Sequence, residues 1–376
     1  QMRGIQQNLV DYFDNDERNI SIINQFFTDL KTKQNSQQIK ELLHFISKFS
    51  NNYHRSNDFF TVFEEIINIY KDDIIQNFTN RQIFRIFHNN KRILLILFEA
   101  KILKPDIYIL KTFLRSKYID EYYLHYFYPE FKNFLNKKLL TKINNSISYN
   151  HYNSDQLILN PEEIESDFES FQQKRKKGEN DKYICELIQK DAIEDFVSYV
   201  TRTNSSLASR INDSIFETNS FLLKRKNTTL IEYASFFGSI QILKYLFMNN
   251  IELTQPMWLY SIHGKNAEII HFLEENKIDP IFNSFEKVLI ESIKCHHNDF
   301  SNYIRINLLN NTESSDFNLN CKKYYNYYFF ADEFEINSDV FYDFCKFDYI
   351  SIVEMILENN DIKLTDLNVL KITEDN

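Results

Sequence analysis

The tightest group of side chains that could do chemistry is Cys295-His296-His297. Thiolate sulfur and imidazole nitrogen are zinc ligands, and a structural zinc site needs four ligands within tetrahedral reach. Adjacent residues on one element point apart, so Cys321, Cys345 or Asp299 would have to complete the site through tertiary packing. The group also lacks the C-x-x-C and H-x-x-x-H spacings that are typical of zinc motifs. We therefore expect no metal, and we interpret the three residues as a turn between two helices.

Other catalytic patterns are weaker. With four cysteines and nine histidines, a nucleophilic pair of Cys185 or Cys345 with some histidine is combinatorially possible and carries no information. The chain has no His-Glu-x-x-His motif and no serine elbow. Neighbouring carboxylates, such as those of Glu64-Glu65, Glu162-Glu163 and Glu274-Glu275, diverge on a helix and do not face each other across a bond. We expect no catalytic residue and predict that the chain is not an enzyme.

Glycine is scarce, with 4 glycines and 5 prolines among 376 residues. No two of Gly4, Gly178, Gly238 and Gly264 lie within six residues of each other, whereas phosphate loops and dinucleotide fingerprints need two or more glycines in that span. No cofactor is therefore expected. A β-sandwich or barrel needs many turns with positive φ, and this chain has few residues to build them. The composition predicts an all-α protein.

Composition also limits the partners. A content of 43% hydrophobic residues, including 35 phenylalanines, is enough for a large core. The net charge of −10 disfavours nucleic acid, because binding to phosphates needs a basic face. The longest strongly apolar run, Ile93–Phe98, is too short to span a bilayer. Scattered cysteines indicate reduced thiols, so we expect an intracellular protein, in the cytoplasm rather than in the nucleus.

Three regions follow one another along the chain. We predict a helical N-terminal region with repeat-like features at 1–150, a charged junction at 151–180, and repeats at 181–376 with long inserts near 201–228 and 308–338. In the first region the apolar spacing predicts helices over Glu41–Phe49, Phe59–Tyr70, Gln82–Phe87 and Lys91–Leu103.

The junction contains a helix start and a basic run. Asn160-Pro161 followed by two glutamates places an N-cap asparagine and a proline at the first helical position. The basic run Lys174–Lys177 then precedes Gly178. Acidic residues at the start of the segment and basic residues at its end suit the dipole of a helix. The alternative interpretation is a nuclear-import signal or a contact to nucleic acid. Lys322-Lys323, followed by tyrosines, would support the same alternative, because base and aromatic side chains interleave in single-strand binders.

The third region repeats itself. A shift of the segment Thr229–Leu246 by 27 residues places Tyr233 on Tyr260 and Leu246 on Leu273. A further shift of 31 residues places Ser261 on Ser292, and a further 52 residues lead to a copy that contains Ile352, Val353 and Ile356. With an upstream copy at Ile184–Val200, the sequence predicts five unevenly spaced copies.

Each copy contains a short helix, a tight turn and a second helix with an apolar face. Thr229 and Glu232 form a capping box at the start of one first helix. An asparagine ends the second helix, and asparagine tolerates the left-handed conformation of a C-terminal cap; these residues are Asn249, Asn276, Asn307 and Asn359. One helix pair cannot bury its own apolar face, whereas stacked pairs can, so we predict an α-solenoid.

At these residues the chain resembles the ankyrin repeat. Thr229–Glu252 aligns without a gap to the ankyrin pattern, with Ala234, Gly238 and Leu246 among its framework positions. Four stretches are more closely similar to a divergent, functionally uncharacterised ankyrin-like family that is expanded in parasitic protists: Ser214–Leu222, Thr229–Gly238, Trp258–Gly264 and Ile293–Asp299. The resemblance covers about 180–376 and implies a protein-binding repeat array.

The chain departs from that pattern in its loops. An ankyrin repeat has about 33 residues and ends in a β-hairpin finger, and a step of 27 residues leaves no room for a full finger between Glu252 and Pro256. We therefore expect binding on the inner helices and the long inserts.

The expected function is non-catalytic protein–protein interaction, as an intracellular adaptor or regulatory scaffold that holds a protein partner on its concave helical face. Two other functions remain as alternatives: a nucleic-acid-associated nuclear regulator that uses the two basic runs, and an enzyme with a site between the N-terminal region and the repeats. The candidate contact residues are the first-helix positions expected to be exposed, namely Tyr233, Phe236, Trp258, Tyr260, His263, Glu291 and Lys294.

Overall fold

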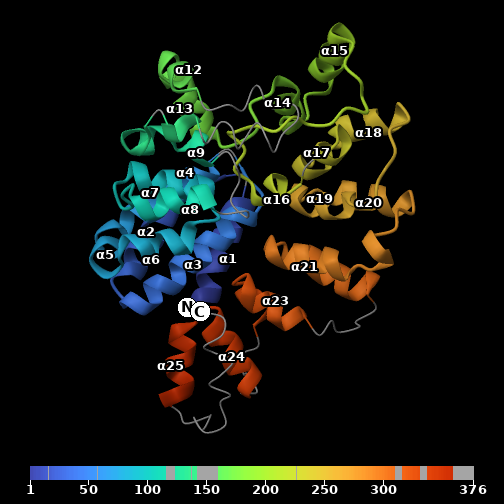
Figure 1. Ribbon diagram of the computed structural model, residues 1–376. Helices are drawn as coiled ribbons and strands as arrows, with labels where there is room; N and C mark the ends of the chain where they lie inside the picture. Colours follow the sequence, from blue (N-terminus) through green and yellow to red (C-terminus); the bar gives the residue numbers. More distant parts are fainter. Residues whose placement is uncertain are drawn as a thin grey trace. The chain divides into compact units, whose positions relative to one another are not determined.

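A computed structural model describes the chain over 1–15, 17–56, 58–115, 123–136, 138–141, 160–225, 227–309, 316–330 and 337–358 (Figure 1). Within these ranges the backbone forms helices and no β-strand, which confirms the all-α prediction. An isolated β-bridge pairs Arg210 with Thr229.

The chain divides into two compact units. Unit 1 combines 1–77 with 279–376, and unit 2 is the continuous segment 78–278. The boundaries expected from the sequence, near 150 and 180, both fall inside unit 2. The division differs from the sequence-based expectation because unit 1 depends on packing between distant segments, which local patterns do not report.

The helices of unit 1 come from both of its segments. They are α1 (Met2–Asp14), α2 (Ile20–Lys31), α3 (Ser36–Asn52), α4 (Phe59–Ile69), α5 (Lys71–Asn77), η2 (Ile281–Asn283), α21 (Glu286–Lys294), α22 (Asn298–Tyr303), the π-helix η3 (Ile304–Leu308), α23 (Phe317–Lys323), η4 (Tyr327–Phe329), α24 (Ser338–Lys346) and α25 (Ile350–Glu358).

The helices of unit 2 follow one another along the chain. They are α6 (Asn80–Phe87), α7 (Lys91–Glu99), α8 (Ile107–Arg115), α9 (Tyr123–Tyr126), α10 (Tyr128–Phe131), η1 (Lys132–Phe134), α12 (Pro161–Ser166), α13 (Phe168–Lys177), α14 (Tyr183–Gln189), α15 (Ile193–Thr203), α16 (Ser220–Leu223), α17 (Leu230–Phe237), α18 (Ile240–Met248), α19 (Met257–Gly264) and α20 (Ala267–Glu275).

Capping chemistry sets several of these helix starts. Thr229 and Glu232 form the predicted capping box of α17, with each side chain bonded to the other residue's backbone N–H. Thr79 and Gln82 form the same box at α6. In the junction, Asn160 accepts a hydrogen bond from the Glu162 N–H and Pro161 occupies the first helical position, as predicted. The first half of the predicted junction, 151–159, lies outside the described residues.

One turn recurs after the first helix of each pair. The central residue of this turn has a positive φ in all four cases, which are Gly238, Lys265, His296 and Asp348. These positions are separated by 27, 31 and 52 residues, which are the offsets of the sequence repeat. At three of the four turns, the N–H of the next residue bonds to a carbonyl five residues back, as in Ser239 to Ala234 at 2.9 Å.

The same turn occurs at two further positions. Asp191 marks the upstream copy, between α14 and α15. Tyr325 marks a copy that the sequence analysis assigned to the insert near 308–338, where α23 is followed by the short η4. At both turns the five-residue backbone bond is present, from Ala192 to Leu187 and from Asn326 to Cys321. The second insert therefore contains a shortened helix pair. Within it, 310–315 and 331–336 lie outside the described residues.

Asn249 and Asn276 are the C-terminal caps of their helices, as predicted, but the left-handed conformation lies one residue later. Asn249 and Asn276 end α18 and α20 with φ of −93° and −84°, and the left-handed residues are the following Asn250 and Lys277. Asn307 lies inside η3, and Asn359 lies outside the described residues. The left-handed expectation for Asn249 and Asn276 is thus wrong, because the motif places its positive φ one residue beyond the cap.

In unit 2, α14, α17 and α19 pack in succession as the first helices of three pairs (Figure 1). The second helices bury Ile242, Leu243 and Leu246 on α18, and Ile269, Ile270 and Leu273 on α20. Polar bonds join successive pairs at their turns. The Ser239 hydroxyl donates to the Ile188 carbonyl, and the Asn266 amide donates to the Gly238 carbonyl at 2.9 Å.

In unit 1, α3 packs against the C-terminal segment. Phe45 contacts Tyr327, and Phe49 contacts His296. The Tyr327 hydroxyl donates a 2.7 Å hydrogen bond to Glu41, which is buried on α3. The core of unit 1 is therefore built jointly by its two segments.

Candidate interaction surface

The structure buries the rings that the sequence analysis expected to be exposed. Tyr233 and Phe236 on α17, and Trp258, Tyr260 and His263 on α19, are between 1% and 6% exposed. The expected exposure of these side chains is wrong. A role for them as partner contacts stays a prediction, and their burial argues against it.

The insert near 201–228 covers three of them, Phe236, Tyr260 and His263. Within it, Phe221 on α16 stacks on Phe236, and its ring centroid lies 4.1 Å from that of His263 and 5.0 Å from that of Tyr260. Arg225 places its guanidinium 3.5 Å from the centroid of the Phe221 ring. The insert therefore packs on the face of α17 and α19 on which a protein partner was expected to bind.

The insert is anchored on its other side as well. Thr218 bonds through its N–H and its hydroxyl to the Gly178 carbonyl. The buried Lys91 ammonium donates to the carbonyls of Ile215 and Glu217, at 2.7 and 3.1 Å. Asn219 caps α16, because its side chain accepts hydrogen bonds from the N–H groups of Phe221 and Leu222. These bonds tie the buried part of the insert, 214–222, into the core of unit 2.

The polar ends of the buried rings also have internal partners. The Trp258 indole N–H donates to the Ile278 carbonyl at 2.7 Å, and the Tyr233 hydroxyl accepts from Gln189 at 3.0 Å. Burial raises the pKa of Tyr233 well above its usual value. Buried aromatic residues with satisfied polar groups are typical of a packed core.

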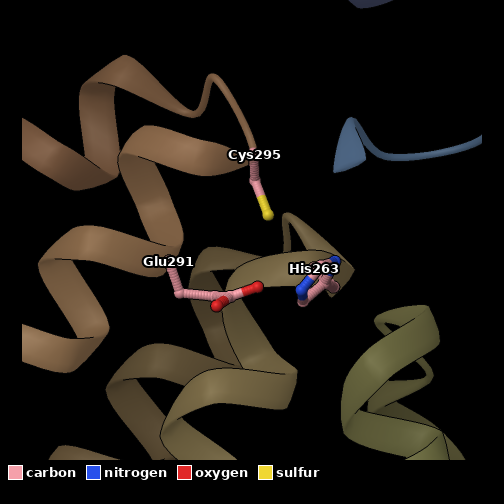
Figure 2. A group of neighbouring side chains, drawn as sticks. All are labelled: His263, Glu291 and Cys295. Atoms are coloured by element: carbon pink, nitrogen blue, oxygen red, sulfur yellow. The ribbon is translucent and has the colours of Figure 1, made fainter. Parts of the chain in front are cut away.

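Glu291 and Lys294 belong to unit 1 and bind each other. The Lys294 ammonium donates to the Glu291 carboxylate at 2.7 Å. Burial lowers the pKa of Lys294, but the charges of Glu291 and then Cys295 outweigh it, so the net shift is upward. Figure 2 shows Glu291 on α21 and Cys295 at the end of that helix, and it also draws His263, which belongs to α19 of unit 2.

The Cys295-His296-His297 group forms the predicted turn between α21 and α22. Cys295 ends α21, His296 has a φ of 56°, and His297 is the N-cap of α22. The His296 ring packs on Phe49, and the His297 ring packs on Tyr53. Burial raises the pKa of the Cys295 thiol well above its usual value, so this sulfur is poorly suited to act as a thiolate ligand or nucleophile.

Residues of both basic runs form ion pairs with acidic residues of their own units. In the first, Arg175 is fully buried and bonds to Glu130 at 2.7 Å. The lysines around it have acidic neighbours: Lys174 with Asp181, Lys176 with Glu99, and Lys177 with Glu179. In the second run, Lys322 is 5% exposed and bonds to Asp343 at 2.7 Å. A linear import signal or a phosphate-binding stripe needs cations at the surface, and the buried Arg175 and Lys322 do not meet this need. The three lysines of the first run are exposed, so the nucleic-acid alternative stays a prediction.

Two carboxylates, the buried Glu41 and the half-buried Glu130, have the raised pKa that acid–base chemistry uses. Glu41 accepts from Tyr327 and Glu130 accepts from Arg175, and burial raises the pKa of both carboxyl groups. Each is therefore engaged by a neighbour within its own unit, in an arrangement that is typical of a structural network.

A partly exposed apolar cluster lies on the second helices of unit 2. We call it the outer patch and define it as Phe247 and Met248 on α18 with Phe272 on α20. Phe247 and Phe272 meet edge to face at 5.2 Å, and Met248 is 73% exposed. Lys244 and Glu268 form an ion pair between the same two helices. The apolar spacing of the second helices indicated packing between repeats alone, so this patch was not predicted from the sequence.

Comparisons of the chain with family models, with curated proteins and with solved structures found no match. Among the helices of the described residues, none has both the length and the apolar character needed to cross a membrane.

Proposed function

We propose that this chain is a non-catalytic protein-interaction module built on ankyrin-like helix pairs, acting as an adaptor or regulatory scaffold in the cytoplasm. The observation that supports it is the positive-φ turn, which recurs at 191, 238, 265, 296, 325 and 348 between paired helices. Stacked helix pairs of this kind form the extended surfaces of solenoid proteins, and such surfaces serve chiefly in binding.

The outer patch is the surface that we assign to the partner. The first helices α17 and α19 are covered by the insert, whereas Phe247 and Met248 remain exposed. Exposed aromatic and methionine side chains are enriched at protein interfaces, where a few apolar anchors provide most of the binding energy. The partner would present an apolar side chain to Met248 and polar groups to the neighbouring pair of Lys244 and Glu268.

The test uses site-specific crosslinking in the full chain. A photoreactive amino acid at position 248 should crosslink one partner directly, and the same group at the exposed Glu163 on α12 should not. Phe247→Ala with Met248→Ala should abolish the crosslinked product made from position 244 and leave the helical circular dichroism unchanged. Equal products from positions 248 and 163 would contradict the proposal.

A second variant separates binding from packing. Phe236→Ala with His263→Ala removes two buried rings that pack on Phe221, so it should lower the stability of unit 2. If that variant melts like the parent and loses the partner, binding would move back to the first helices, and the outer patch would be the wrong surface.

A further inference from the structure

The contact between α3 and the C-terminal segment of unit 1 contains buried imidazoles. His296 places its ring 5.0 Å from that of Phe49 and 5.8 Å from that of Phe45, and is 1% exposed. The next residue, His297, packs edge-on against Tyr53 at 5.3 Å. From the other side, α3 contributes His44 to the same contact. A neutral imidazole packs well among aromatic rings, whereas an imidazolium there loses its hydration.

His44 lies against two of the turns described above: the turn at Tyr325, between α23 and η4, and the turn at Asp348, between α24 and α25. Its ring is parallel to that of Tyr325, with centroids 5.8 Å apart. Its Nε2 atom is 3.6 Å from the carboxylate of Asp348. Two lysines of its own helix, Lys40 and Lys48, also act on it, and Lys40 bonds to the same Asp348 carboxylate at 3.0 Å. The Asp348 carboxylate thus faces Lys40 and His44.

These surroundings favour neutral histidines. Burial lowers the pKa of His44 to about 4; Asp348 opposes this effect, and Lys40 and Lys48 add to it. Burial lowers the pKa of His296 to about 3 against the opposing effect of the Tyr324 backbone. Histidine in an unfolded chain has a pKa of about 6.5, so the unfolded state binds more protons at acid pH. Stability from these two residues is therefore present above about pH 6.5 and is lost as the pH falls toward 4.

One carboxyl group in the same contact works in the opposite direction. Glu41 is buried on α3 beside Tyr327, and burial raises its pKa. A raised carboxyl pKa favours the folded state as the pH falls, so Glu41 offsets part of the histidine effect. Variants of the histidines alone distinguish the two contributions.

We propose that the contact between α3 and the C-terminal segment of unit 1 is an acid-sensitive clasp, which opens when His44 and His296 take up protons. Opening bares the rings that now form the contact, namely Phe45, Phe49, Tyr325 and Tyr327. The proposal concerns unit 1 and does not depend on the outer patch of unit 2.

Hydrogen exchange of the full chain, corrected for intrinsic rates, tests the clasp. The opening equilibrium of α3 should rise at least about tenfold between pH 6.5 and pH 4.5. His44→Gln with His296→Asn removes both titrations, and asparagine tolerates the positive φ of position 296. In this variant the ratio between the two pH values should fall below about twofold, because the two titrations to which the proposal assigns the opening are absent.

Three controls keep the test decisive. His271→Gln alters an exposed histidine of unit 2 and should leave the parent's pH response of α3 unchanged. If the double variant does not fold, His44→Gln alone should reduce the response. NMR of the histidine ring protons should also find His44 and His296 neutral at pH 5.5. Equal protection of α3 at both pH values in the parent, an undiminished response in the variants, or ring protons that titrate near pH 6.5 would each overturn the proposal.

Discussion

Gly238 and Gly264 pack backbone to backbone. A Cβ atom on Gly264 would overlap the Ser235 carbonyl oxygen and would lie 2.8 Å from the Gly238 nitrogen. A Cβ atom on Gly238 would lie 2.7 Å from the Gly264 carbonyl oxygen. The first helices α17 and α19 therefore approach each other at a distance that only glycine permits at these positions.

Gly264→Ala should destabilise unit 2 by about 1–3 kcal/mol, because the new methyl group meets rigid backbone atoms. Gly4→Ala is the matched control, since nothing lies within 4 Å of its added Cβ. Gly4 lies in α1, where alanine should stabilise by about 0.5–1 kcal/mol. Thermal melts followed by circular dichroism compare the two variants. Equal melting of Gly264→Ala and the parent would contradict the close approach.

Leu246→Ala and Leu273→Ala should each cost about 2–5 kcal/mol, because both side chains are fully buried and each deletion leaves a cavity. The fluorescence of Trp258, the only tryptophan of the chain, reports the unfolding of unit 2 in urea. Met248→Ala, at a position that is 73% exposed, should change the unfolding free energy by less than about 0.5 kcal/mol. Unshifted midpoints for both leucine variants would refute the repeat register.

Arg175→Ala should cost about 3–5 kcal/mol, because it leaves the Glu130 carboxylate without its buried partner. Arg175→Met combined with Glu130→Gln should recover much of this loss, since both charges are then removed. Lys176→Ala, on the exposed side of the same run, should have little effect. Urea unfolding followed by Trp258 measures all three variants. An Arg175→Ala variant as stable as Lys176→Ala would show that the buried pair does not support unit 2.

Asp191→Ala should cost about 1 kcal/mol or more, because the carboxylate accepts hydrogen bonds from the N–H groups of Gln241 and Ile242 at the start of α18. Alanine is also less suited than aspartate to the φ of 48° at this position. Asp191→Asn keeps an acceptor and tolerates positive φ, so it should lose less. Urea midpoints that are equal for the two variants would argue against this cap.

Local patterns predicted the parts of the fold that depend on short segments. The capping box of Thr229 and Glu232 and the start at Asn160 could be predicted because cap chemistry involves residues only two or three apart. The repeat offsets predicted the positions of the turns, although Lys265 and His296 stand where glycine would be expected. The copy at Tyr325 escaped detection because its second helix is reduced to η4.

The candidate surface could not be predicted in the same way. Phe236 lies three residues after Tyr233, and His263 lies three residues after Tyr260, which is the spacing of one helix face. The sequence does not show that Phe221 from the insert packs on Phe236 and His263. The packing of α3 on the C-terminal segment likewise has no signal in the local sequence. Both features depend on which distant segment packs on an apolar face, and periodicity identifies only the face itself.

The discontinuous core of unit 1 delays the folding of this unit during translation. Residues 1–77 are synthesised first, but the helices that complete their core begin after the whole of 78–278. At about 5–20 residues per second, translation of that intervening segment takes roughly ten to forty seconds. During this time unit 2 can fold while Phe45 and Phe49 have no C-terminal partner. The nascent N-terminal helices are therefore expected to need a holding chaperone, and a stop codon placed after unit 2 should yield a product prone to aggregation.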